Sequence, residues 1–189
     1  MKVVLVVVSI GNRPWFNYCH PWMNLYCKRF EFDFLICHRP LLTQIKETQF
    51  RKFQDYGRCQ KLGIRFLFDE YDRIIQLDDS CMIAPDTPDL STIVPQHAIG
   101  CFIEGPSKAA KFDLFLKQHK LAYARTNELP RTRFYNNGVA VYSREHAAVF
   151  DPAHMPWKTI GQQNFYPTGG FLSHRADELG IALHDLGLD

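Results

Sequence analysis

A short apolar strand that ends in two adjacent acids is the strongest constraint on how this chain folds. Ile74, Ile75 and Leu77 are followed at once by Asp78 and Asp79. Ligands of open α/β sheets bind in the crevice at the carboxyl ends of such strands. Two neighbouring carboxylates there repel each other unless a cation or hydrogen-bond donors are close to them. The sequence therefore predicts a binding site at the end of this strand.

Strand-like and helix-like segments alternate along the rest of the chain. Further strands are predicted at residues 3–9, 32–37, 97–104 and 138–142. Helices are predicted at residues 15–29, 43–56, 57–68, 90–94, 106–123, 144–150 and 172–179. This alternation predicts an α/β fold with a mixed, mostly parallel sheet flanked by helices. Residues 1–189 are expected to form one domain, because no repeat or linker interrupts them.

Charge and composition argue against several classes of function. The formal net charge is only +2 and the basic residues are scattered, so nucleic acid is not expected as a partner. No apolar run approaches the roughly 20 residues of a membrane-spanning helix, and the apolar residues 3–8 are too few for a secretory signal. The six cysteines lack zinc-site spacing, so we expect reduced thiols and a cytoplasmic protein.

Four segments, in order, resemble motifs of GT-A fold glycosyltransferases, especially glycogenin-like and bacterial galactosyltransferase-like enzymes. Residues 71–78 (YDRIIQLD) are similar to the family's strand that carries a DxD-like motif. Residues 61–62 (KL), 134–142 (FYNNGVAVY) and 157–165, with GQQN at 161–164, are similar to three further segments. The resemblance implies a Rossmann-like GT-A fold that binds a nucleotide-sugar, most often a UDP-sugar.

The resemblance also implies a divalent metal ion, Mn²⁺ or Mg²⁺, which stabilises the departing diphosphate as a Lewis acid. Its predicted ligands are Asp78, Asp79 and Ser80, with His184 as a late histidine ligand. Ser80 stands where the family has its second metal carboxylate, and Gln162 replaces another acid. Three interpretations are open: Asp79 turns inward as the substitute ligand, Ser80 coordinates the ion weakly, or the metal site itself is weak. We favour metal binding by Asp78 together with Asp79.

The residues expected to hold the nucleotide-sugar come from several predicted elements. The end of the first strand would hold the nucleoside, a lysine would meet the diphosphate as a point charge, and an amide beside a glycine would line the sugar site. These residues are Ser9, Arg13, Trp15, Lys61, Asp78, Asn137 and Gly138. Plainer structural roles, such as an Asn-Gly turn or a solvated lysine, remain open alternatives.

Three residues are candidates for catalysis. The resemblance places Gln163 and Asn137 near the transferred sugar. Glu104 ends a predicted strand and is a candidate general base toward an acceptor hydroxyl, with a salt-bridged edge carboxylate as the alternative. The relatives imply retention at the anomeric carbon, whereas an essential Glu104 would favour inversion.

We therefore predict metal-dependent transfer of a hexose or deoxyhexose from a UDP-sugar to a carbohydrate or glycoprotein acceptor, with a GDP-sugar as the open alternative. A nucleotidyltransferase is a second possibility, although residues 11–14 contain a single Gly where such enzymes carry a Gly-rich basic loop. A degenerate domain that binds nucleotide or sugar without turnover is the third, suggested by Ser80 and Gln162.

Overall fold

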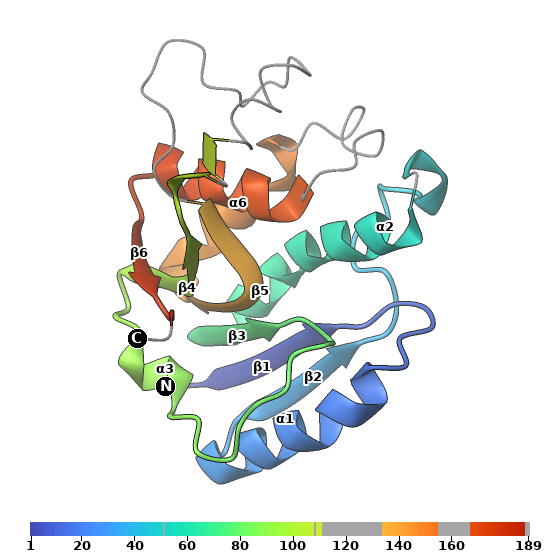
Figure 1. Cartoon of the computed structure of the whole chain (residues 1–189). Helices are drawn as coiled ribbons and strands as arrows, with labels where there is room; N and C mark the ends of the chain where they lie inside the picture. The colour runs from blue at the N-terminus through green and yellow to red at the C-terminus, as the bar shows by residue number, and fades with distance from the viewer. Residues whose placement is uncertain (51, 108, 111–133, 155–166, 188–189) are drawn as a thin grey trace.

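A six-stranded mixed sheet forms the centre of the computed structural model, which describes residues 1–50, 52–107, 109–110, 134–154 and 167–187 (Figure 1). In spatial order the strands are β2 (Asp33–Cys37), β1 (Val3–Val8), β3 (Arg73–Leu77), β5 (Phe134–Ser143), β4 (Ala98–Glu104) and β6 (Ala182–Asp185). The pairs β1–β2, β1–β3 and β4–β6 are parallel, whereas β5 runs antiparallel to both of its neighbours.

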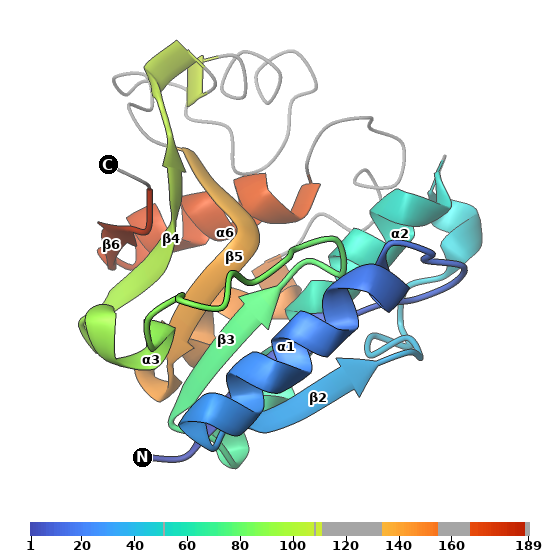
Figure 2. The ribbon, with the colours of Figure 1, turned by 60° about the horizontal axis from the view of Figure 1, so that its bottom comes forward.

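Helical segments cover both faces of this sheet. The α-helices are α1 (Phe16–Phe30), α2 (Phe53–Cys59), α3 (Leu90–Ile93) and α6 (Pro167–Glu178). The 3₁₀ segments are η1 (Glu47–Gln49), η2 (Gln60–Asp69), η3 (Arg144–Phe150) and η4 (Pro152–His154). Helix α1 packs over β1 and β3 on one face of the sheet (Figure 2). Segments α2, η2, η3 and α6 cover the opposite face.

The valine-rich strand β1 explains why two helical layers are needed. Val4, Val6 and Val8 point into a core shared with η2, η3 and α6. Val3, Leu5 and Val7 point to the other face, where Phe16 and Met23 of α1 pack against them. Because successive side chains of a strand alternate between faces, a strand buried on both sides must be apolar at every position.

The sheet register places the end of β3 beside the middle of β5. Leu77 pairs with Val139 in the antiparallel ladder, and the Asp78 amide donates to the Gly138 carbonyl at 2.7 Å. On the other side of β3, Val7 pairs with Leu77, so the segment after β1 also reaches this edge. Three segments that are distant in the sequence therefore meet around Asp78.

The predicted α/β fold is confirmed, and several predicted elements need correction. The strand predicted at 138–142 begins at Phe134, so the Asn-Asn-Gly segment lies inside β5 and not in a turn. The segments predicted as α-helices at 57–68 and 144–150 are largely 3₁₀ in character. Strand β6 was not predicted, because its four residues are exposed or half-buried and lack a strong apolar pattern. Most of the helix predicted at 106–123 lies outside the described residues.

Candidate active site

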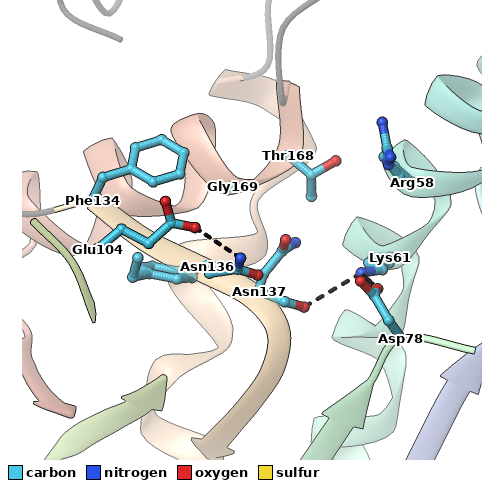
Figure 3. Close-up of a pocket in the computed structure, with 10 residues that line it drawn as sticks. Arg58, Lys61, Asp78, Glu104, Phe134, Asn136, Asn137, Thr168 and Gly169 are labelled. Atoms are coloured by element: carbon cyan, nitrogen blue, oxygen red, sulfur yellow. Dashed lines mark hydrogen bonds and ion pairs between the residues drawn. The ribbon is translucent and has the colours of Figure 1, made fainter. Parts of the chain in front are cut away.

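A buried lysine contacts both sides of the predicted site. Lys61, on η2, forms an ion pair with Asp78, and its Nζ also donates to the Asn137 carbonyl at 3.3 Å (Figure 3). The Lys61 side chain is 6% exposed, whereas that of Asp78 is 40% exposed. A buried ammonium needs such partners, because desolvation otherwise strongly disfavours its charged form. The structure thus brings together Lys61, Asp78 and Asn137, three of the residues that the sequence singled out.

Hydrogen bonds hold the Asn-Asn-Gly segment of β5 in place beside this ion pair. Gln76 Nε2 donates to the Asn137 carbonyl at 2.8 Å, and the Gly138 amide donates to Asn136 Oδ1 at 2.8 Å. Asn136 Nδ2 in turn donates to Glu104 Oε1 at 2.8 Å (Figure 3). The Asn137 carbonyl, the Gly138 amide and the Asn136 side chain therefore all have partners within the protein. With these groups satisfied, the segment can remain in a strand although Asn-Gly is also a turn sequence.

Asn137 retains a spare hydrogen-bond donor. Its Nδ2 is buried and has no hydrogen-bond partner among the described residues. The side chain extends from β5 toward Gly169 at the start of α6 (Figure 3), where a Cβ on that glycine would stand 3.6 Å from Asn137 Oδ1. A buried donor without a partner is costly, so a ligand oxygen at this position would be stabilising.

A small polar cavity of about 110 Å³ lies between η2, β5 and α6. It carries two cationic and two anionic side chains together with amides and a hydroxyl, a mixture suited to a ligand with many hydroxyl groups or a phosphate. Its lining residues are Arg58, Lys61, Asp78, Glu104, Phe134, Tyr135, Asn136, Asn137, Thr168 and Gly169. Arg58, Thr168 and Gly169 were not predicted site residues, although the basic character of the segment around Arg58 was visible in the sequence.

A larger and more apolar cavity of about 870 Å³ meets the polar one at Asp78 and Asn136. Its walls come from residues 81–93, from β4 and β5, and from β6 with the residues after it. The apolar wall includes Met82, Ile83 and Phe102, while His184 is a polar group on the same cavity. The predicted residues Asp78, Gly138 and His184 therefore share one open space.

Asp79 points away from the ion pair of its neighbour. Arg13 binds its carboxylate through two hydrogen bonds, Nη2 to Oδ1 at 2.6 Å and Nε to Oδ2 at 2.5 Å. The Asp79 side chain is only 6% exposed, and the hydrogen bond to its carboxylate raises the pKa of Arg13. This two-pronged geometry is the strongest that an arginine and a carboxylate form.

The residues of this edge fit a metal ion only in part. Each Asp79 oxygen accepts a hydrogen bond from Arg13, so an ion shared by Asp78 and Asp79 would lie beside that guanidinium, and repulsion between the two cations disfavours the arrangement. Asp78 Oδ2 faces Gly138, on which a Cβ would stand 3.2 Å from it, and His184 lines the same cavity. Ser80 is exposed. The described residues contain no cluster of three or more acidic, histidine or cysteine side chains able to hold a metal.

The remaining predicted residues have different surroundings. Ser9 is buried, and its amide donates to the Cys37 carbonyl at 3.0 Å. Trp15 is exposed at the start of α1 and lines neither of the two cavities. Gln163, like the Gln162 departure, lies outside the described residues. None of the six cysteines, all of which lie among the described residues, forms a disulfide. No helix that the structure describes is both long enough and apolar enough to cross a membrane.

No protein-family model matches this sequence, and no curated protein matches it significantly. Solved structures do match the fold. A glycosyltransferase involved in the glycosylation of the major capsid of PBCV-1 has a TM-score of 0.54 at 14% identity, with 98% of this chain and 82% of that chain covered. Apo mouse xyloside xylosyltransferase 1 has a TM-score of 0.50 at 12% identity, with 98% and 84% covered. The chain thus has a GT-A-like fold, as its motifs predicted.

Proposed function

We propose that the protein is a glycosyltransferase that moves a hexose or deoxyhexose from a nucleotide-sugar, a UDP-sugar in the first instance, to a carbohydrate or glycoprotein acceptor. The observation that carries the proposal is the meeting of Lys61, Asp78 and Asn137 around one polar cavity in a GT-A-like fold. The sequence motifs had already singled out all three of these residues.

The donor sugar is assigned to the small polar cavity. Asn137 Nδ2 is a buried donor in need of an acceptor, and Gly169 leaves the backbone of α6 accessible to a ligand. Glu104 and Asp78 supply acceptors, so hydroxyl groups on a pyranose ring would find both kinds of partner. The site would prefer the epimer whose hydroxyl group accepts a hydrogen bond from Asn137 Nδ2. An epimer that cannot reach this buried donor would leave it without a partner and bind more weakly.

The departing diphosphate is assigned to the cationic wall of the same cavity. Lys61 and Arg58 lie on this wall, and a phosphate that approaches it would compete with Asp78 for the lysine. Positive charge that is already in position stabilises the leaving group as its negative charge grows. The predicted Mn²⁺ or Mg²⁺, if bound by Asp78 and His184, would add Lewis-acid stabilisation to that group.

The acceptor would approach from the larger cavity, with Glu104 as the candidate base. Glu104 lines the polar cavity and is oriented by the hydrogen bond from Asn136. Asn136 also lines the larger cavity, so an acceptor hydroxyl that arrives there is near the same hydrogen-bond network. Proton removal by Glu104 at that point would suit an inverting reaction.

Saturation-transfer NMR over a panel of UDP- and GDP-sugars, with and without Mn²⁺, tests the proposal. We expect one donor to bind and to be slowly hydrolysed, and we expect the signal to be lost in Asp78→Asn but kept in the exposed control Asp69→Asn. Tight binding that persists in Mn²⁺-free buffer without hydrolysis would favour the degenerate binding domain instead. No binding of any nucleotide-sugar would refute both.

A further inference from the structure

The antiparallel ladder between β4 and β5 is interrupted beside the candidate site. Cys101 pairs with Ala140, but the next residue, Phe102, pairs with Asn136. Residues 137–139 are therefore left out of this ladder, both strands of which lie among the described residues. Irregularities of this kind disrupt a ladder locally and are common next to active sites, where they re-aim a side chain. The backbone groups of the irregular segment need other partners, because a buried carbonyl without a donor is costly.

Two side chains are the partners of the Asn137 carbonyl. Gln76 Nε2 donates to it at 2.8 Å, and Lys61 Nζ donates to it at 3.3 Å (Figure 3). A carbonyl oxygen has two lone pairs, so both are in use. The same oxygen therefore links a residue inside β3 to the ammonium group that the proposed function places beside the diphosphate.

Gln76 is an unusual residue for its position. It is 0% exposed in the middle of β3, a strand that is buried at every position, and its neighbours on the adjoining strands are Val6 and Ala140. Its Oε1 is buried and has no partner among the described residues. Burying an amide with an unpaired oxygen costs free energy that an apolar side chain of similar size would avoid. Departures of this kind from a consistent core are expected at functional sites.

We propose that Gln76 is a positioning residue, which fixes the Asn137 carbonyl and through it the Lys61 ammonium. A phosphate that takes Lys61 away from Asp78 would leave this carbonyl as a protein acceptor that still holds the lysine. Gln76 lines neither cavity, so a ligand would not displace it. The lysine would thus stay in place while negative charge grows on the leaving group. The effect on turnover rests on the proposed function, whereas the hold on Lys61 does not.

Gln76→Met tests the effect on turnover. Methionine is of similar length and suits a buried strand, but it cannot donate to the carbonyl. We expect kcat for the donor to fall about tenfold, with a smaller change in KM, because the position of the lysine matters most in the transition state. The matched control is Ile74→Met, at an equally buried position on the same face of β3 that lines neither cavity. This control should turn over the donor like the unaltered chain.

Urea denaturation separates positioning from a purely structural role. Because Gln76→Met removes a buried amide whose oxygen is unpaired, its unfolding midpoint should be no lower than that of Ile74→Met. A lower kcat without a lower midpoint supports the proposal. An unchanged kcat would overturn it. A Gln76→Met chain that unfolds far below the control, or that does not fold at all, would make Gln76 a structural residue and overturn it as well.

Acylation of Lys61 gives a measure that needs no donor. Sulfo-N-hydroxysuccinimide acetate labels free amines, and peptide mass spectrometry compares Lys61 with the exposed Lys46 of the same chain. The Lys61 side chain is 6% exposed and bound by two acceptors, so its labelling should be slow. Gln76→Met should speed it severalfold and Ile74→Met should not; equal rates in the two variants would overturn the proposal. Faster labelling in Gln76→Met, with no nucleotide-sugar turned over by the unaltered chain, would support the hold on Lys61 and refute the proposed function alone.

Discussion

Asp78 and Asp79 are neighbours in the sequence but belong to two different regions of the molecule. Asp78 lies where the two cavities meet, is partly exposed and pairs with Lys61. Asp79 lies in a buried junction where Arg13, from the segment after β1, binds both of its oxygens. The chain turns directly after β3 ends at Leu77, and each of the two acids obtains its own internal cation. The difference teaches that a pair of acids in sequence need not act as a pair in space.

The largest expected effect is a loss of catalytic activity when Asp78 is replaced. Asp78→Asn keeps the shape of the side chain but removes the charge that faces the cavity and Lys61, so we expect glycosyl transfer or donor hydrolysis to fall about 100-fold or more. Turnover of the donor identified by NMR is the measurement. Asp69→Asn serves as the matched surface control. Unchanged turnover in Asp78→Asn would show that the cavity at this acid is not the site of chemistry.

The second effect is on stability, and for the other acid it is expected without a loss of turnover. Asp79→Asn leaves Arg13 with one good acceptor in a buried junction, so we expect a loss of about 2 kcal/mol in the free energy of unfolding, less than for a fully buried pair because Arg13 is partly exposed. Urea denaturation measures it. Asp78→Asn takes the carboxylate away from the buried Lys61, so it should also lower the free energy of unfolding, by a similar amount. Donor turnover by folded Asp79→Asn as low as that of Asp78→Asn would erase the distinction between the two regions.

A smaller effect concerns the space beside Asp78. A methyl group at position 138 would stand 3.2 Å from Asp78 Oδ2 and 3.1 Å from Asn136 Oδ1. Gly138→Ala should therefore push both acceptors aside and raise the KM for the donor about tenfold, with a smaller change in kcat. Gly57→Ala, at a glycine whose added Cβ would meet no atom within 4 Å, is the control that should leave KM unchanged.

The smallest effect reports how tightly the strand end is packed. Cys81 donates from Sγ to the Gly138 carbonyl at 3.4 Å, and burial raises its pKa to about 11. Because this pKa lies above the ordinary value, the thiol stays protonated at pH 8, and its alkylation should be slow and rise about tenfold per pH unit up to pH 10. Peptide mass spectrometry follows the labelling. Asp79→Asn should speed it severalfold, whereas a rate typical of an exposed thiol in the unaltered chain would contradict the packing.

The sequence predicted five of the six described strands, and several residues that it singled out lie close together at one edge of the sheet. Lys61, Asp78, Asn137 and Gly138 are brought together there. The partners of each acid were not predictable, since the choice between Arg13, Lys61 and a metal depends on side-chain directions that local patterns do not encode.

Other parts of the site also required the fold. Thr168 and Gly169 carry no chemical signature in the sequence and reach the cavity only because α6 packs against β5. Strand β6 escaped prediction because half-exposed edge strands lack the apolar pattern of central ones. Without β6 the sequence could not show that His184 shares a cavity with Asp78.

The antiparallel pairing of β4 with β5 has a consequence for how such a protein diversifies. Glu104 pairs with Phe134, so the long connection between them leaves the sheet and re-enters it at the same rung of the ladder. Lengthening a connection with closed ends costs little entropy, about 0.6 kcal/mol for each doubling. The length of the connection can therefore change at little cost while the rungs that position Asn136 and its neighbours stay in register.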